Sequence, residues 1–280
     1  MSNQSSDPPA RKANDIIARG VKKPNLAGTA TLIGLRALDP LLQYEILAKG
    51  LGSSLLAKLG LSTVPLGTAL VVKTGIAAID NLGLPLPSLI LLGMSVGSAV
   101  KQIFWLTYIS KEDFPPSSAV FVSAYNSVAN SICSLLFVAA ATSASLSTSL
   151  SVPLLGTSTR LPLPVAVGTA LYLVGMILEA GSEVQRKWFK DKPENAGKIC
   201  TEGLWSWARH INYGGYTLWR AGYALASGSW IAGLAVGAVQ ALHFVRIGMG
   251  NLDYYMSNHY GQQWARYKQN VRWSLIPGIY

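Results

Sequence analysis

The stretch PLPSLILLGMSVGSAVKQIFWLTYI, residues 85–109, carries a single charged side chain, Lys101. A helix that crosses a bilayer needs about 20 consecutive, mostly apolar residues. Two later stretches, 118–142 and 163–181, have a similar length and composition. These three segments predict membrane-spanning helices, and they decide the fold class of the chain.

Two further segments are apolar but interrupted. Residues 27–80 fit either one span with an interfacial helix or two spans, because charged residues and prolines break the apolar pattern. Residues 216–248 form a long apolar stretch broken at ASGSW, residues 226–230, which predicts a hairpin of two helices. One crossing in 27–80 gives six crossings, a number that leaves both termini and segment 183–215 on the same side.

The composition agrees with a membrane protein. Of the 280 residues, 50% are hydrophobic and only 13% are charged, whereas soluble domains carry about a quarter charged residues. The net charge of +10 gathers in segments 11–23, 183–209 and 266–272, which flank apolar spans as the cytosolic parts of membrane proteins do. We expect an all-α, polytopic membrane helical bundle with cytosolic N- and C-termini, in contact with membrane lipids and without a nucleic-acid partner.

The pattern divides the chain into three parts. Residues 1–26 are polar and basic and lack the apolar core of a signal peptide, so we expect a cytosolic tail. Residues 27–181 hold the N-terminal transmembrane helices, which we expect to contact the membrane lipids and the lipid-soluble substrate. Residues 182–280 hold most of the clustered polar and aromatic groups and are expected to form a cytosol-facing cofactor pocket.

The cysteines and histidines do not indicate a metal site. Cys133 lies in an apolar run and Cys200 in a polar segment, which gives no disulfide framework. His210, His243 and His259 lack the spacing typical of metal ligands. We therefore expect no metal.

Three ionisable residues fall within or beside the apolar segments: Lys73, Lys101 and Glu179. An ionised group at membrane depth is costly unless it is paired or hydrated, which makes each a functional candidate. The alternative for the two lysines is a long stem that carries the charge to the headgroups. Glu179 lies near the predicted cytosolic end of its helix, beside the polar segment.

Segment 203–216, GLWSWARHINYGGY, concentrates rings and hydrogen-bonding groups at a membrane edge. An aromatic belt would explain its tryptophans and tyrosine. It would not explain an Arg-His pair and an Asn-Tyr pair beside two glycines, which let a ligand approach the backbone. Aromatic faces suit a planar base or nicotinamide. The residues concerned are Trp205, Trp207, Arg209, His210, Asn212 and Tyr213.

Basic and aromatic residues on either side of this segment permit two interpretations. The basic run between Arg186 and Lys198 is either a surface that faces lipid headgroups or a site for the phosphates of a cofactor. In the tail, Tyr260, Trp264 and Tyr267 share one face of a predicted helix. Such a stripe is either helix packing or one wall of a cofactor pocket.

Three segments in this order resemble a membrane superfamily. They are QRKWFKDKP at 185–193, LWSWARHINYGGY at 204–216, and the tail from 253 to 280, with YGQQW and IPGIY. The patterns are similar to those of sterol reductases, the steroid 5-alpha-reductase C-terminal domain and isoprenylcysteine carboxyl methyltransferases. RHINYGGY also resembles the RHPNYFGE motif of uncharacterised, DUF1295-like members. The resemblance covers about the last hundred residues.

The resemblance implies an NADPH site. Arg186 and Lys190 would bind phosphates, and the other groups would line the nucleotide and nicotinamide or complete the pocket from the tail. These other residues are Trp205, Arg209, Asn212, Tyr213, Asp253, Tyr260 and Tyr267. The implied reaction is NADPH-dependent reduction of a carbon–carbon double bond in a sterol-like or other lipid-soluble enone or olefin. The resemblance also implies a location in the membrane of the endoplasmic reticulum. The candidate proton donors are His210, Tyr213 and Glu179.

Departures from the family patterns keep two other functions open. Ile211 replaces a proline, Met256 replaces a cysteine, and Tyr216 stands where the reductases have an acid. An S-adenosylmethionine-dependent methyltransferase of the isoprenylcysteine type is one alternative, although Leu252-Asp253 replaces its usual paired glutamates. A non-catalytic lipid-binding membrane protein is the other, supported by Tyr216.

Overall fold

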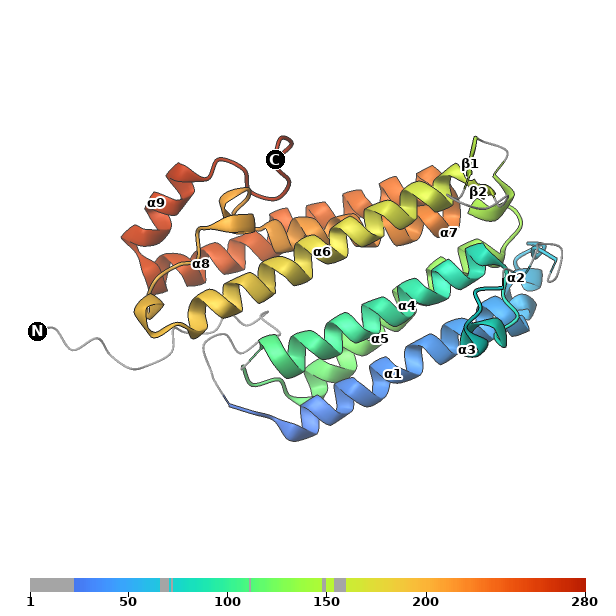
Figure 1. The fold of residues 1–280 in the computed structure, drawn as a ribbon, viewed down its shortest axis with the longest axis horizontal. Coiled ribbons are helices and arrows are strands. Elements are labelled where there is room, and N and C mark those ends of the chain that lie inside the picture. The colour runs from blue at the N-terminus through green and yellow to red at the C-terminus, as the bar shows by residue number, and fades with distance from the viewer. Residues whose placement is uncertain (1–22, 66–70, 72, 111, 148–149, 154–159) are drawn as a thin grey trace, which may run out of the picture.

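The computed structural model describes residues 23–65, 71, 73–110, 112–147, 150–153 and 160–280, so most of the predicted tail 1–26 lies outside the described residues. The protein is an all-α bundle (Figure 1), as predicted. The helices are α1 (Leu26–Lys49), α2 (Ser53–Lys58), α3 (Ala77–Asp80), α4 (Leu86–Phe104), α5 (Pro116–Val138), α6 (Leu163–Asp191), α7 (Ile211–His243), α8 (Met249–Tyr260) and α9 (Gln262–Asn270). Strands β1 (Ser151–Pro153) and β2 (Arg160–Pro162) pair antiparallel.

In the described part of the chain, four helical stretches are long and apolar enough to cross a membrane: Leu86–Ile109, Pro116–Val138, Leu163–Asp191 and Ile211–Tyr260. The first three confirm the three spans expected from the sequence. Large apolar side chains on their outward faces are exposed, as lipid contact requires of a membrane bundle. They include Val100, Val128, Ile132, Leu173 and Ile177.

The described residues of segment 27–80 form one long helix, α1, followed by the short helices α2 and α3. The inward face of α1 is polar: Arg36, Asp39 and Gln43 are buried at a spacing of three and four residues. Lys73 is exposed in a non-helical segment before α3. The expectation that Lys73 is a charge within a membrane-spanning segment was therefore wrong.

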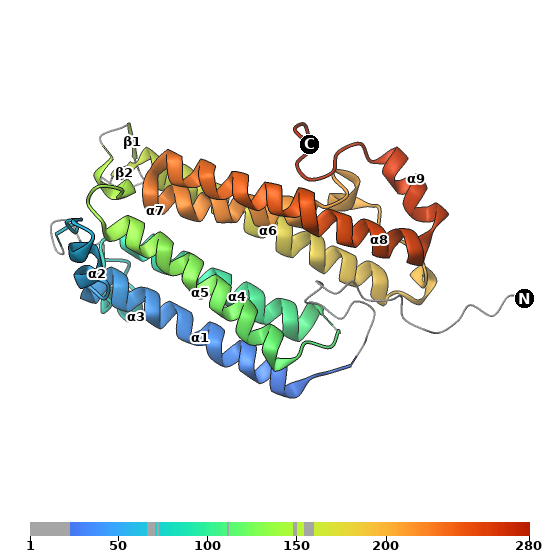
Figure 2. The ribbon, with the colours of Figure 1, turned by 180° about the vertical axis from the view of Figure 1, so that it is seen from behind.

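The predicted hairpin is present in α7. Gly228 and Ser229 leave the helical conformation, and Ser229 has φ +75°. The chain then reverses: a Cβ placed on Gly233 would lie 2.7 Å from Leu225 Cβ. Residues 211–227 are the first arm of α7, and residues 230–243, extended by α8, are the second. Figure 2 shows the second arm and α8 running back along the bundle.

The first arm of α7 packs very closely on α6 through glycines. A Cβ on Gly215 would lie 2.5 Å from Glu179 N, and a Cβ on Gly222 would lie 2.5 Å from Tyr172 N. Small residues spaced seven apart on each helix allow this approach, as is common between membrane helices. Successive turns of α6 therefore lie in backbone contact with successive turns of the first arm of α7.

The bundle has two layers, with α1, α4 and α5 in one and α6 with α7 and α8 in the other (Figures 1 and 2). The start of α1, the 3₁₀ turn Gly203–Ser206, α9 and the C-terminus lie at one end of the bundle. The β1–β2 hairpin, α2 and α3 lie at the other. Helix α6 runs through the predicted boundary at 181–182, and the division into a substrate half and a cofactor half stays a prediction about function.

Candidate functional site: a polar end and a polar interior

The end of α6, the turn Gly203–Ser206 and α9 bring three predicted residues together. Trp205 is buried and donates its indole N–H to Ser182 O at 2.8 Å. Tyr267 donates its hydroxyl to Trp205 O at 2.6 Å. The Arg186 guanidinium lies 5.3 Å from the centroid of the Trp205 ring. Arg186, Trp205 and Tyr267 therefore belong to one site.

Glu183 also belongs to this group of residues and was not predicted from the sequence. It is buried, pairs with Arg186, and accepts a hydrogen bond from Asn212 Nδ2 at 2.7 Å. With Nδ2 committed to the carboxylate, Asn212 Oδ1 is buried and has no hydrogen-bond partner. The signal was the four-residue spacing of Glu179 and Glu183, which places both carboxylates on one face of a helix.

His210 is buried at the start of α7, where its backbone N–H donates to Ser274 O at 2.8 Å. Its ring stacks on Tyr213 at 5.6 Å and meets the edge of Trp264 at 6.1 Å. His210 Nδ1 has no hydrogen-bond partner. Burial, and next the charge of Arg209, lower the pKa of His210 from 6.5 to about 4. The imidazole is therefore neutral at neutral pH and suits hydrogen bonding better than proton donation.

This pKa gives a pH dependence of stability. In the unfolded chain His210 gains a proton below about pH 6.5, whereas in the folded chain it stays neutral until about pH 4. The free energy of unfolding should therefore fall by about 3 kcal/mol as the pH falls from 6.5 to 4, with no further loss from this group below that. Thermal unfolding of the full chain in detergent across this range measures it. His210→Gln should flatten the slope, and the exposed control His259→Gln should not. An unchanged slope in His210→Gln would contradict the assignment.

Arg209 holds the C-terminal tail. It donates to Val271 O at 2.5 Å, to Arg272 O at 3.1 Å and to Ser274 Oγ at 2.5 Å. All of these acceptors are uncharged. Arg209 therefore fixes the tail against the start of α7, and its predicted contact with a cofactor stays a prediction.

The remaining predicted residues lie where α8 and α9 meet the end of α6. Lys190 Nζ donates to Tyr260 Oη at 2.8 Å and also to Lys198 O. Asp253 accepts hydrogen bonds from Trp264 Nε1 at 2.7 Å and Lys268 Nζ at 3.0 Å. Trp264 also meets the ring of His210, so it contacts both Asp253 and the histidine.

Tyr213 connects the end of the bundle with the second arm of α7. Its ring stacks on Phe244 at 4.4 Å and on His210 at 5.6 Å. One turn further, Tyr216 meets the edge of Phe244 at 5.4 Å. The hairpin thus supplies an aromatic wall behind the RHINYGGY segment.

Glu179 and Lys101 form an ion pair inside the bundle. The distance from Lys101 Nζ to Glu179 Oε1 is 2.5 Å, and the two side chains are only 10% and 16% exposed. Trp219 Nε1 donates to the other carboxylate oxygen, Glu179 Oε2, at 2.6 Å. Lys101 is thus paired with an acid from α6 rather than extended toward headgroups. Glu179 is an acceptor on both oxygens, and its role as a proton donor stays a prediction.

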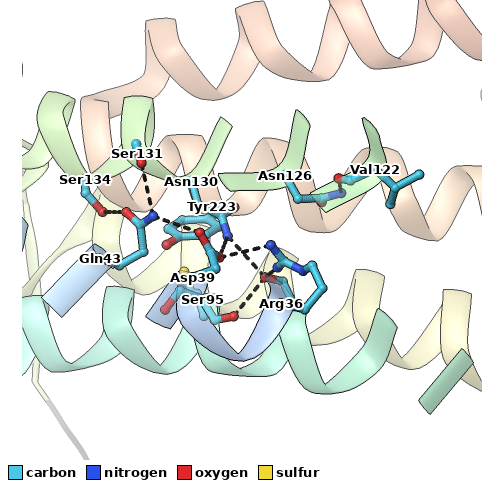
Figure 3. A network of polar contacts seen from close by, with 12 residues as sticks. Arg36, Asp39, Gln43, Ser95, Val122, Asn126, Asn130, Ser131, Ser134 and Tyr223 are labelled. Carbon is cyan, nitrogen blue, oxygen red and sulfur yellow. Dashed lines mark hydrogen bonds and ion pairs between the residues drawn. The ribbon is translucent and has the colours of Figure 1, made fainter. Parts of the chain in front are cut away.

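A second polar cluster fills the interior between α1, α4, α5 and α7 (Figure 3). Arg36 pairs with Asp39 at 3.2 Å, and both side chains are fully buried. Asn130 Nδ2 donates to Asp39 Oδ2 at 2.7 Å, and Gln43 Nε2 donates to Asp39 Oδ1 at 3.0 Å. In the sequence these charges only interrupt an apolar pattern. The spacing of Arg36, Asp39 and Gln43 was the signal that one face of a helix is polar.

Long apolar helices with a polar interior and a basic, aromatic end define an integral membrane protein with a candidate binding site at one end of its bundle. Residues 121–271 match the family model described as "Protein of unknown function (DUF1295)". The chain belongs to the DUF1295 family. The match confirms the resemblance found in the last hundred residues and extends it back into α5.

Curated relatives carry two different names. The chain is 34% identical to the probable O-methyltransferase ustE of Ustilaginoidea virens, over 95% of this chain and 90% of that protein. It is 27% identical to the Delta(14)-sterol reductase ERG24B of Gibberella zeae, over 42% of this chain and 34% of that protein. It is 28% identical to the Delta(14)-sterol reductase of Neurospora crassa, over 39% and 33%. The chain is therefore similar to Delta(14)-sterol reductases over part of its length and to a probable O-methyltransferase over nearly all of it.

Proposed function

We propose that the chain is an NADPH-dependent reductase of a carbon–carbon double bond in a sterol-like or other lipid-soluble enone or olefin. The observation that carries this proposal is that Arg186 and Lys190 lie at the end of α6, where Glu183 joins Arg186 to Asn212. Lys190 donates to a carbonyl and a hydroxyl, both uncharged, so its charge suits a phosphate. The partial similarity to Delta(14)-sterol reductases supports the same reaction.

The residues present fit a nucleotide cofactor. The buried acceptor Asn212 Oδ1 has no donor, and a buried polar atom without a partner costs free energy. A carboxamide N–H or a ribose O–H would satisfy it. Arg186 and Lys190 would face the phosphates. When bound, the cofactor supplies the hydride, and a proton from the protein completes the reduction. Of the three predicted donors, Tyr213 is the best suited, because His210 is neutral at neutral pH.

A second candidate is methyl transfer from S-adenosylmethionine to an oxygen of a lipid-soluble substrate. The similarity to the probable O-methyltransferase ustE favours it, because that similarity runs along nearly the whole of both chains. The acids Glu183 and Asp253 near the same end of the bundle would suit the positively charged groups of that cofactor.

Cofactor titration of the full chain in detergent tests the two candidates. We expect NADPH to raise the melting temperature at concentrations near its Kd, and NADH to do so only at higher concentration, because it lacks the 2′-phosphate. Stabilisation by S-adenosylmethionine without a response to NADPH would replace the first candidate with the second. A response to neither would support a non-catalytic lipid-binding protein.

Arg186→Ala should weaken NADPH binding by roughly tenfold, the scale of one charge-assisted hydrogen bond, and NADH binding by much less. The matched control is Arg160→Ala, since Arg160 is an exposed arginine whose bonds go to Ser151 at the opposite end of the bundle. It should leave both affinities unchanged. Equal weakening of NADPH and NADH in Arg186→Ala would show that Arg186 acts only through its pair with Glu183.

For the location we propose the membrane of the endoplasmic reticulum with the polar end toward the cytosol. The start of α1, the end of α6 and the C-terminus lie at the same end of the bundle, which supports this orientation (Figure 1).

Among the described residues, no group of three His, Cys, Asp or Glu side chains is placed to hold a metal ion.

A further inference from the structure

Arg220 is a buried cation in the first arm of α7, and its hydrogen bonds go only to uncharged acceptors among the described residues. It is 3% exposed. It donates to Asn130 Oδ1 at 2.9 Å, to Tyr216 Oη at 3.3 Å and also to Asn126 Oδ1. Its guanidinium lies 4.3 Å from the centroid of the Trp219 ring. Uncharged acceptors and an aromatic face orient this cation without neutralising it.

The charges around Arg220 leave one positive charge in excess. Asn130 links Arg220 to Asp39, but the carboxylate of Asp39 already pairs with Arg36. Lys101 and Glu179 neutralise each other. In the described interior of the bundle, two arginines thus share one aspartate. An unneutralised charge away from water is costly, and an anionic group from a ligand would offset that cost.

An open groove on the outer face of the bundle has Lys101 in its lining. It lies between α4 and α6, has a volume of about 320 Å³, and is lined by apolar side chains together with Lys101. Gly97, Phe104 and Met176 are among the lining residues. Lys101 Nζ lies 5.5 Å from the centroid of the Tyr216 ring, and Arg220 lies 5.6 Å from the same ring. The ring of Tyr216 is therefore near two cations, Lys101 in the lining of the groove and Arg220 in the interior of the bundle.

We propose that Arg220, with the hydroxyls of Tyr216 and Tyr125, forms a subsite for a negatively charged or negatively polarised oxygen on a planar, lipid-soluble ring. The Tyr125 ring lies 5.8 Å from the guanidinium, and its hydroxyl donates to Gln240 Oε1 at 3.3 Å. The oxygen is that of a phenol or of a conjugated enone. This subsite rests on the proposed function, because it would orient the substrate of the same enzyme. The attraction between Arg220 and an anionic oxygen does not depend on which cofactor binds.

Tyr216 has a defined role in this subsite. An acid at position 216 would neutralise Arg220 and repel an anionic oxygen, whereas a tyrosine hydroxyl accepts the hydrogen bond of Arg220 and leaves its charge in place. The replacement of the acid by Tyr216 therefore changes the preferred ligand from a neutral or cationic group to an oxyanion. Tyr216 and Arg220 determine specificity.

Ligand binding to the full chain in detergent tests this subsite with three probes: 2-naphthol, its methyl ether 2-methoxynaphthalene, and the enone 4-cholesten-3-one. Quenching of tryptophan fluorescence reports binding, because Trp219 lies against the guanidinium. We expect the phenol to bind more tightly than its ether. Arg220→Gln should weaken the phenol by roughly tenfold and the ether by less than twofold. Weakening of the enone as well would identify a carbonyl substrate, and weakening of the phenol alone would identify a phenolic one.

Tyr216→Phe keeps the ring and removes one hydroxyl, so it tests the subsite if Arg220→Gln fails to fold. It should weaken the phenol roughly threefold to tenfold, the scale of one hydrogen bond, and leave the ether unchanged. Arg160→Gln, far from the groove, is the control. Equal affinity of phenol and ether in the wild-type chain, or full phenol affinity in both variants, would overturn the subsite. Cofactor titration of the same variants separates this result from a failure of the proposed function.

Discussion

Asp39→Asn should lower the free energy of unfolding by about 3–5 kcal/mol, the cost of leaving a buried partner charge unneutralised. Asp39 is the carboxylate that faces Arg36 with both side chains fully buried, and Asn130 connects it to Arg220. The substitution keeps the shape of the side chain and removes its charge. Two buried arginines would then remain without an acid. Thermal or denaturant unfolding of the full chain in detergent measures the loss.

The control for this substitution lies on the same helix. Glu45 pairs with Lys49 at the surface, where their side chains are 43% and 57% exposed. Glu45→Gln should change stability by less than about 1 kcal/mol, because exposed ion pairs contribute little. The double variant Arg36→Met with Asp39→Leu should recover much of the loss, since it removes both charges. Equal effects of Asp39→Asn and Glu45→Gln would show that the interior is hydrated.

Gly215→Ala should destabilise the protein by about 1–3 kcal/mol or more and weaken cofactor binding at the same time. The added methyl group would lie 2.5 Å from Glu179 N and 2.7 Å from Gly175 O, which are backbone atoms that cannot rotate away. The two helices would have to separate. Because α6 carries Arg186 and α7 carries Asn212, the separation would also disturb the end of the bundle. Unfolding and cofactor titration measure the two effects.

Gly93→Ala is the matched control for Gly215→Ala. Gly93 is exposed in α4, and a Cβ placed there meets no atom within 4 Å. Alanine is favoured over glycine within a helix by about 1 kcal/mol, so this variant should be neutral or slightly stabilising. A stable Gly215→Ala variant would mean that the α6–α7 contact adapts more easily than its geometry indicates.

The membrane helices could be predicted because length and apolar composition are local properties. Residues 85–109, 118–142 and 163–181 gave helices, and ASGSW gave the turn of the hairpin. Helix α1 was harder, because the charges that break its apolar pattern face inward toward other helices. Hydropathy averaged along the chain does not distinguish an inward-facing charge from an exposed one.

At the end of the bundle, the sequence indicated which residues gather there but not which contacts they make. Arg186, Trp205 and Tyr267 lie close together, and their role in binding a cofactor stays a prediction. Arg209 holds the tail, and the buried Glu183 was not predicted. The subsite around Arg220 could not be found from spacing. Its partners Asn126 and Asn130 lie 94 and 90 residues away in the sequence, on a different helix.

Helix α6 has a mechanical consequence. It carries Glu179 in the bundle interior and Arg186 at the bundle end, seven residues apart, which corresponds to about 10 Å along a stiff rod. If helix α6 slides or tilts so that one of these two side chains moves, the other side chain moves with it. We therefore expect a ligand that shifts Arg186 at the bundle end to shift Glu179 in the interior as well, because both side chains are carried by the same helix.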